Sequence, residues 1–333
     1  MGRPGRPLTG PHPSVAQTRT AVRRALGPGE NRLALVACSG GADSLALAAA
    51  AAFAGPRLGW RIGLVTVDHN LQAGSAERAA AVAAWAADAG LTPAIVAPVT
   101  IDPADPVGPE AAARHARYEA LLQQSEEYAA AALLLGHTLD DQAETVLLAL
   151  ARGAGPRGLA GMPARREVDG VAVLRPMLGV RRTTLREACA EQGLTPWEDP
   201  HNSDDRYARA RVRSSALPAL VTALGPGVVG NLAQTAAQLA ADASYLDGLA
   251  ATAYAECRSG SGLSVDALRA LPDALRGRVL HTWALELGAP GAALGHRHVA
   301  ALDALVTAWH GQGPTALPGG IEVHREDGRL LSR

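Results

Sequence analysis

Short apolar runs alternate with longer Ala- and Leu-rich segments over the first two-thirds of the chain. A short apolar run bounded by turn residues is typical of a buried strand, and a longer Ala-rich segment is typical of a helix. We expect strands at residues 33–37, 61–67, 92–99, 131–135 and 171–174, and helices at 14–26, 44–54, 75–89, 110–127, 140–152 and 183–192. This alternation predicts an α/β fold with a doubly wound parallel sheet, in which ligands bind beyond the carboxyl ends of the strands.

The composition changes near residue 216, beyond which helical patterns predominate. Residues 228–255, 264–271, 274–287 and 297–309 read as helices, and 316–323 as a small hairpin or strand pair. We therefore expect three parts: a partly disordered N-terminal extension over 1–30, an α/β domain over 31–216, and a smaller, mainly helical domain over 217–333.

A glycine turn joins the first predicted strand to the helix that follows it. Its residues are Ser39, Gly40, Gly41, Ala42, Asp43 and Ser44. Paired glycines let backbone N–H groups approach an anion, and the helix N-terminus adds positive charge. A Walker loop requires a lysine, which this chain lacks, and the spacing does not fit a dinucleotide-binding GxGxxG. The turn therefore predicts another kind of phosphate site, with Asp43 in an exposed turn, although an ordinary connection uses the same residue types.

A second polar cluster follows the fourth predicted strand. It contains His137, Asp140, Asp141 and Glu144. Acidic residues in a first helical turn also act as caps, which accounts for one carboxylate more readily than for three and a histidine. Such a cluster is suited to hold Mg²⁺ on ATP phosphates or an incoming ammonium group.

The formal net charge is −1, so a nucleic-acid surface must be local. A local basic patch comprises Arg181, Arg182 and Arg186, followed by Arg206, Arg209, Arg211 and Arg213. The four arginines at 206–213 predict phosphate contacts, with a solvated interdomain linker as the alternative. The three cysteines show no CxxC spacing, and no secretory signal or membrane-spanning run is evident. These features favour a soluble cytoplasmic protein.

The glycine turn resembles the SGGxDS signature of PP-loop ATP pyrophosphatases. With VDHNLQ, EAAARHARYEAL, GHTLDDQAET, RGAGPRGL and RPML in this order, residues 31–216 resemble the tRNA(Ile)-lysidine synthetase family, and Leu317–Gly320 resembles the end of that family's substrate-binding domain. The resemblance implies ATP-dependent attachment of L-lysine to C2 of the wobble cytidine of CAU-anticodon tRNA(Ile), through an adenylated cytidine. Gln72 stands where the family usually has arginine, so any role of that arginine does not transfer.

The resemblance also implies roles for individual residues. The turn residues 39–44 would hold the pyrophosphate portion of ATP, with Asp68 and His69 beside the nucleotide. Magnesium would arrive with ATP, through Asp43 or Asp140. Catalytic roles fall to Asp43, Arg114, His137, Asp140 and Asp141, and tRNA contacts to Arg117, Tyr118, Arg206, Arg209 and Arg213. A surface helix with routine charges is the alternative for Arg114, Arg117 and Tyr118.

Lysine chemistry sets one further requirement. The ε-amine has a pKa near 10.4, so only about 0.04% is neutral at pH 7 and a group must accept its proton. Asp140 and Asp141 are the candidates, with Glu144 next. Two other functions were weighed: another PP-loop enzyme, either a tRNA thiolase or an amide-forming synthetase, and a catalytically inactive tRNA-binding protein. Iron–sulfur thiolases need paired cysteines, and binding alone would not require both polar clusters.

Overall fold

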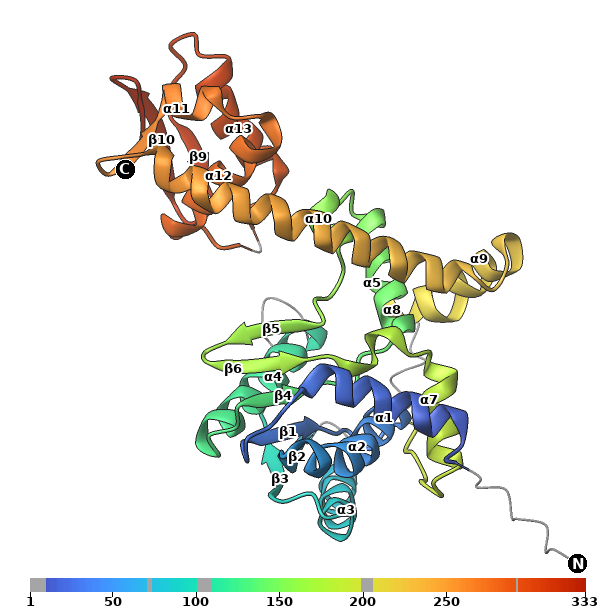
Figure 1. The fold of residues 1–333 in the computed structure, drawn as a ribbon. Coiled ribbons are helices and arrows are strands. Elements are labelled where there is room, and N and C mark those ends of the chain that lie inside the picture. The colour runs from blue at the N-terminus through green and yellow to red at the C-terminus, as the bar shows by residue number, and fades with distance from the viewer. Residues whose placement is uncertain (1–9, 71–73, 101–108, 199–205, 292) are drawn as a thin grey trace, which may run out of the picture. The chain divides into compact units, whose positions relative to one another are not determined.

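The computed structural model describes residues 10–70, 74–100, 109–198, 206–291 and 293–333 (Figure 1). The chain divides into two compact units, Met1–Ala237 and Gln238–Arg333, each with its own sheet. The division lies inside helix α10 (Val228–Cys257), beyond the composition change near residue 216. Residues 1–9 of the predicted extension and Gln72 lie outside the described residues.

The first unit contains a six-stranded sheet of order β3-β2-β1-β4-β6-β5. Its strands are β1 (Leu33–Ala37), β2 (Arg61–Asp68), β3 (Ala94–Pro98), β4 (Ala132–Leu134), β5 (Arg165–Val168) and β6 (Val171–Leu174). Its helices are α1 (Pro13–Leu26), α2 (Ala42–Ala54), η1 (Pro56–Leu58), α3 (Ser75–Asp88), α4 (Pro109–Glu127), α5 (Leu139–Ala151), α6 (Pro156–Leu159), η2 (Pro176–Gly179), α7 (Arg182–Ala190), α8 (Ala208–Arg211), the π-helical η4 (Val212–Ala216) and α9 (Leu217–Leu224). The predicted strands and the parallel sheet are confirmed, with ends shifted by one or two residues.

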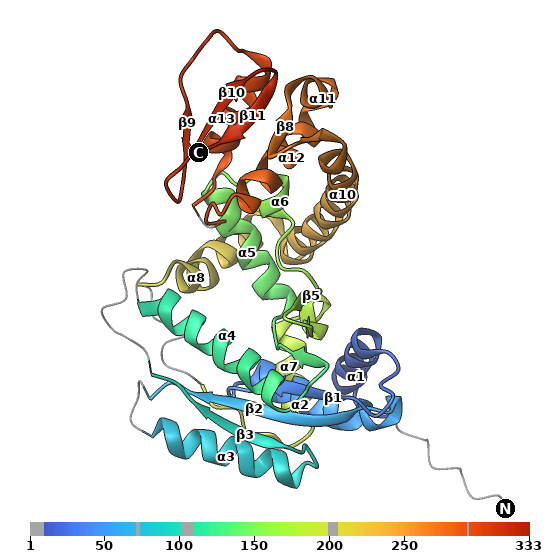
Figure 2. The same ribbon diagram turned by 90° about the vertical axis from the view of Figure 1, so that its left-hand side faces the viewer.

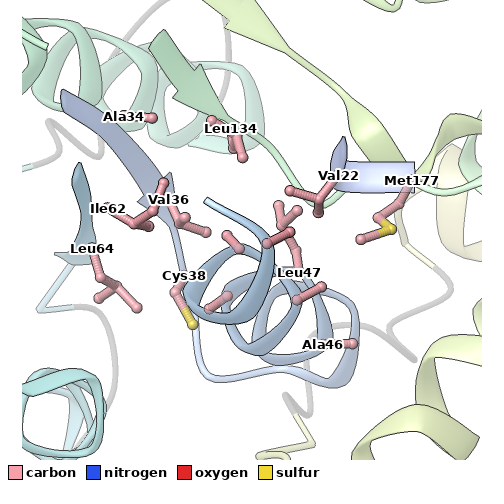
Figure 3. Close-up of a cluster of buried hydrophobic side chains, with 14 of the residues drawn as sticks. Val22, Ala34, Val36, Cys38, Ala46, Leu47, Ile62, Leu64, Leu134 and Met177 are labelled. Carbon is pink, nitrogen blue, oxygen red and sulfur yellow. The ribbon is translucent and has the colours of Figure 1, made fainter. Parts of the chain in front are cut away.

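Successive residues of β1 point to opposite faces of the sheet and into different cores. Ala34 and Val36 join a cluster with α1, α2 and α7 that includes Leu47 and Met177 (Figure 3). Leu33 and Leu35 join a second cluster with α4. Figure 2 shows α3 and α4 on opposite faces of the sheet. A strand buried on both faces explains why the sequence of β1 is apolar throughout.

Two local features differ from the sequence-based expectations. Strand β5 pairs antiparallel with β6 at the edge of the sheet, and its exposed Arg-Arg-Glu sequence carried no strand signal. Helix α1 was expected to begin at residue 14 but begins at Pro13. The Nδ1 atom of His12 caps it by accepting a hydrogen bond from the backbone N–H of Ser14, and Val22 is fully buried beneath the helix. Helix α1 is therefore packed into the core of the first unit.

The sheet topology creates a crevice between β1 and β4. The chain leaves β1 toward α2 on one face, whereas it reaches β4 through α4 on the other. Such a reversal of strand order is where open α/β sheets bind ligands. Both polar clusters predicted from the sequence follow these two neighbouring strands, so the fold brings them to one edge.

The second unit combines its predicted helices with a small antiparallel sheet. Its sheet has the order β7-β8-β11-β10-β9, with β7 (Arg258–Ser259), β8 (Gly262–Ser264), β9 (Thr315–Leu317), β10 (Ile321–Glu326) and β11 (Arg329–Ser332). The helices α11 (Val265–Ala270), α12 (Asp273–Glu286) and α13 (His296–Thr307) pack on it around Leu263, Leu280 and Leu302. The expected hairpin is β9–β10. The other three strands have two to four residues, too short to be recognised in the sequence.

Within the described ranges, no single helix combines the length and hydropathy of a membrane span. Two helical segments, Ala208–Leu224 and Val228–Cys257, together have the length and composition of a membrane span, but the angle between them is 101°.

Candidate functional site

The side chain of Ser44 forms two hydrogen bonds with the backbone of the glycine turn after β1. Its hydroxyl accepts a hydrogen bond from the backbone N–H of Ser39 at 3.2 Å and donates one to the carbonyl of Gly41 at 2.9 Å. Gly40 has φ +83°, a conformation that glycine adopts without strain. Gly41 precedes α2 without a side-chain cap, so the first N–H groups of the helix stay available to an anion.

The turn after β4 approaches the glycine turn closely. A Cβ atom built on Gly136 would lie 3.3 Å from the backbone carbonyl of Asp43. That separation is tighter than ordinary van der Waals contact, so glycine allows the two turns to meet. His137 and the start of α5 are thereby placed beside the start of α2.

A cavity of about 750 Å³ opens between these turns. Among the predicted residues, its lining includes Ser39, Gly41, Ala42, Asp43, Ser44, Asp68, His69, Arg117, Tyr118, His137, Asp141 and Arg213. The structure therefore joins the glycine turn, the end of β2, helix α4 and the acidic cluster in one wall. Gly40, Arg114, Asp140, Arg206 and Arg209 are not among the described residues that line it.

Arg182, in the first turn of α7, lies at the centre of an ion-pair cluster. Its guanidinium contacts Asp43 at 3.2 Å, Asp141 at 2.7 Å and Glu144 at 3.3 Å. Arg213 contacts the same Asp141 at 3.3 Å and Glu144 at 2.8 Å. Glu144 is fully buried, and a buried carboxylate requires such partners. The cluster ties the glycine turn to α5, α7 and η4.

Asp140 and Asp141 face different surroundings although they are adjacent. Both oxygens of Asp140 accept hydrogen bonds from the Nε atom of Arg181, and one also accepts from the backbone N–H of Arg182. Asp141 forms a capping box with Thr138: its Oδ2 atom accepts from the Thr138 backbone N–H and hydroxyl, both at 2.8 Å. Only Asp141 reaches the cavity.

The pKa values of Asp43 and Asp141 are shifted in opposite directions. Burial raises the pKa of Asp43 to about 6, although Arg182 opposes the shift. Burial also favours a raised pKa for Asp141, but Arg182 and the hydrogen bonds from Thr138 outweigh it and lower this pKa. Asp141 is therefore ionised near neutral pH. Asp43, expected in an exposed turn, is in fact in the first helical turn with 27% of its side chain exposed.

His137 and residues of helix α4 also line the cavity. Burial lowers the pKa of His137 to about 3, so its ring is neutral. Its Nδ1 atom and the Tyr118 hydroxyl are buried, and neither has a hydrogen-bond partner among the residues described. The guanidinium groups of Arg114 and Arg117 lie 5.2 and 5.9 Å from the centre of the Tyr118 ring. Such unsatisfied polar atoms facing a cavity are suited to contact a ligand.

The basic segment at 206–213 is not a plain solvated linker. Arg213 and Arg209 turn toward α5, where the Nη2 atom of Arg209 donates to the hydroxyl of Thr145 at 2.9 Å. Arg206 is exposed. The tRNA contacts of Arg206, Arg209 and Arg213 therefore stay a prediction.

Sequence reasoning missed two residues of this site. It grouped Arg182 with neighbouring arginines as a basic patch, because sequence spacing does not show which carboxylates the fold brings to it. Trp197 also lines the cavity; its backbone N–H donates to Gly40 at 3.0 Å, and Arg78 lies 4.3 Å from its ring centre. No motif marked this tryptophan, and only the fold places it against the glycine turn.

Two family models match the chain. A PP-loop domain matches residues 15–220, and a TilS substrate binding domain matches residues 263–331. The solved structure of the U34-tRNA thiolase NcsA from Methanococcus maripaludis, described with its [4Fe-4S] cluster, has a TM-score of 0.57 at 18% identity, covering 68% of this chain and 80% of that one. At this identity the likeness shows the fold alone.

Curated relatives match nearly the whole chain. A tRNA(Ile)-lysidine synthase from Salinispora tropica is 62% identical over 96% of this chain and 96% of its own. Proteins of the same name from Thermobifida fusca and Mycobacterium bovis are 52% and 45% identical, covering 97% and 96% of this chain and 99% and 97% of their own.

Proposed function

The chain belongs to the tRNA(Ile)-lysidine synthase family, and from this premise we propose that it ligates L-lysine to C2 of the wobble cytidine of CAU-anticodon tRNA(Ile). The reaction changes codon specificity from AUG to AUA. The observation that carries the chemistry is the single cavity whose wall joins the glycine turn to Asp141. An enzyme that first adenylates a base and then admits an amine needs both parts within one enclosure.

In the first half-reaction, the C2 oxygen of the cytidine attacks the α-phosphorus of ATP and pyrophosphate leaves. Residues 39–44 supply N–H groups and a helix N-terminus for the departing phosphates. Asp68 and His69, at the end of β2, line the same cavity and would lie beside the nucleotide. The anticodon base is single-stranded, so little energy is needed to unpair it.

In the second half-reaction, the ε-nitrogen of lysine attacks C2 and AMP leaves. Asp141 is ionised and reaches the cavity, which favours it over Asp140 as the group that meets the lysine ammonium. Because Asp141 lines the cavity and Asp140 does not, we assign the same carboxylate to take up the proton that the amine releases. Glu144 is fully buried behind Arg182 and Arg213 and serves to hold them.

His137, Arg117 and Tyr118 line the same cavity. A neutral His137 can accept or donate a hydrogen bond to the base or phosphate without adding charge. Arg117 supplies a fixed positive charge for the polyphosphate or the tRNA. Arg114 is exposed and reaches the cavity only through its ring contact with Tyr118, so we assign it a positioning or tRNA-contact role.

Magnesium fits beside Asp43. This ion usually binds phosphates with one or two carboxylates and keeps several waters, so a dedicated cage is not required. No group of three or more His, Cys, Asp or Glu in the described ranges forms such a cage. The Oδ1 atom of Asp43 is buried and has no hydrogen-bond partner there, whereas both oxygens of Asp140 are taken. When bound, magnesium would offset the charge of the phosphates.

The experiment that tests the proposal measures AMP formation from labelled ATP with transcribed tRNA(Ile), with and without lysine. We expect AMP release to require both tRNA and lysine, and lysine to become attached to the tRNA. The same anticodon loop with uridine at the wobble position is the matched control. AMP release with an amino acid other than lysine, or attachment of lysine to the control tRNA, would contradict the proposal.

A further inference from the structure

Arg175 is a buried cation that has no carboxylate partner among the described residues. It follows β6 and is 7% exposed. Its Nη1 atom donates to the carbonyl of Pro163 at 2.8 Å, but its Nε atom is buried without a hydrogen-bond partner in the described parts of the chain. Buried Arg276, by contrast, contacts two aspartates, at 2.6 and 2.7 Å. Burying an unpaired charge is costly, so Arg175 is suited to meet an anion from outside the chain.

Arg175 lines a second cavity, distinct from the one beside the glycine turn. This groove of about 720 Å³ runs between one face of α1 and the residues of β5, β6 and η2 that lie opposite. Ala16, Gln17, Thr20 and Arg24 contribute from α1. The two cavities share no lining residue among those described. Because β4 and β6 are neighbouring parallel strands, Arg175 and His137 nevertheless follow the same edge of the sheet.

The charge of the groove has a single sign. Its lining contains Arg24, Arg165 and Arg175 and, within the described residues, no aspartate or glutamate. Arg24 and Arg165 are exposed, whereas Arg175 is buried. Guanidinium groups bind phosphate through paired N–H groups, and this arrangement places one such group inside and two accessible ones around it.

We propose that this groove binds a backbone phosphate of the tRNA substrate, as a docking site separate from the catalytic cavity. The proposal rests on the proposed function for the identity of the RNA. A tRNA whose wobble base enters the first cavity presents further phosphates along the same edge of the sheet, and an anion there would supply the partner that Arg175 lacks.

Two ordinary explanations exist for the exposed arginines, and each offers a matched control. Arg24 lies in the last turn of α1, where cations complement the helix dipole, and Arg23 shares that turn. Arg165 lies on an edge strand, where charge discourages pairing with other chains, and Arg166 is its neighbour. Arg23 and Arg166 are exposed but do not line the groove.

The test compares Arg24→Gln/Arg165→Gln with Arg23→Gln/Arg166→Gln, two variants with the same change in net charge. Binding of fluorescent tRNA(Ile) is measured from 50 to 300 mM salt without ATP or lysine. We expect the groove variant to weaken binding and flatten the plot of log Kd against log salt by up to about 0.9 per lost contact. The control variant should keep the wild-type slope. Equal slopes in the two variants would overturn the proposal.

Arg175→Gln provides a second, independent test. If Arg175 contacts a tRNA phosphate, Arg175→Gln should weaken tRNA binding. The melting temperature of this variant should stay near that of the wild type or rise. A melting temperature that falls with unchanged tRNA affinity would assign Arg175 a purely structural role and overturn the proposal.

Inorganic pyrophosphate distinguishes a free anion from an RNA phosphate. We expect it to raise the melting temperature of the wild type and the groove variant equally, because it binds the glycine turn. Loss of that rise in the groove variant would make the groove an inorganic-anion site and overturn the proposal. Since tRNA binding is measured without catalysis, failure of lysine transfer in the wild type would contradict the proposed function independently of the groove.

Discussion

The Nη2 atom of Arg182 lies 2.7 Å from Oδ1 of Asp141, and this contact joins segments 41 residues apart in the chain. Through its other nitrogens the same guanidinium contacts Asp43 and Glu144. One side chain therefore fixes the positions of the glycine turn and of α5. The arrangement makes Arg182 a positioning residue whose loss leaves three carboxylates facing one another across a half-buried space.

We expect Arg182→Gln to destabilise the protein by about 3–5 kcal/mol, because it removes the cation shared by Asp43, Asp141 and Glu144 and leaves only Arg213 beside the last two. AMP formation should fall with it, since Asp43 and Asp141 lose their common support. Urea unfolding at pH 7.5 measures the first effect. Arg186→Gln is the control: Arg186 pairs with exposed Glu198 and should change stability by less than about 1 kcal/mol. Equal effects of the two substitutions would contradict the assignment.

His137 makes stability depend on pH in a definite direction. Its folded pKa of about 3 lies below the unfolded value of 6.5, so only the unfolded state takes up a proton between these values. Stability therefore falls as pH drops through 6.5, by about 2 kcal/mol between pH 7.5 and 5. His137→Gln should remove this loss, and exposed His115→Gln should keep it. Urea unfolding at both pH values decides between these outcomes.

Asp43 contributes to the pH dependence of stability in the direction opposite to His137. Its folded pKa of about 6 lies above the unfolded value of 3.8, so the folded state takes up a proton first as pH falls. Between pH 7.5 and 5 this contributes a gain of about 1 kcal/mol. Asp43→Asn should abolish the gain, whereas Asp88→Asn, on an exposed position of α3, should retain it. Equal changes in stability between pH 7.5 and 5 in Asp43→Asn and in the wild type would show that the pKa of Asp43 is not raised.

The sequence was sufficient to predict the parts of the fold that follow from local pattern. Residues 33–37 are apolar because both faces of β1 are covered, and the glycines at 40 and 41 mark the turn after it. The two polar clusters were expected to follow the first and fourth predicted strands, where ligands of an open α/β sheet bind. In the structure, residues of both clusters line one cavity.

What the sequence did not show depends on contacts between distant residues. Arg182 looked like one arginine among several, and nothing local indicates that three carboxylates converge on it. Asp140 and Asp141 were interchangeable in the sequence, yet the helix start turns one toward Arg181 and the other into the cavity. Strand β5 carries exposed charged residues because it is an edge strand, so it lacks the apolar pattern that identified the others.

The difference between Asp140 and Asp141 leads to a prediction about the amine step. If Asp141 meets the lysine ammonium, Asp141→Asn should raise the KM for lysine or slow its transfer by about 10- to 150-fold. This range corresponds to a charge-assisted contact of roughly 1.5–3 kcal/mol. Asp140→Asn should change lysine use less, because the Asp140 carboxylate is bonded to Arg181 outside the cavity.

Single-turnover experiments with separately labelled ATP and lysine follow the two half-reactions. In Asp141→Asn the adenylated tRNA should accumulate and react with hydroxylamine, which replaces lysine as the nucleophile. Since Asp141 also caps α5, both variants must be compared at equal folded fraction, established by circular dichroism. A larger lysine defect in Asp140→Asn would reverse the assignment. If neither substitution affects lysine transfer, Glu144→Gln is the next variant to test, because Glu144 shares Arg182 and Arg213 with Asp141.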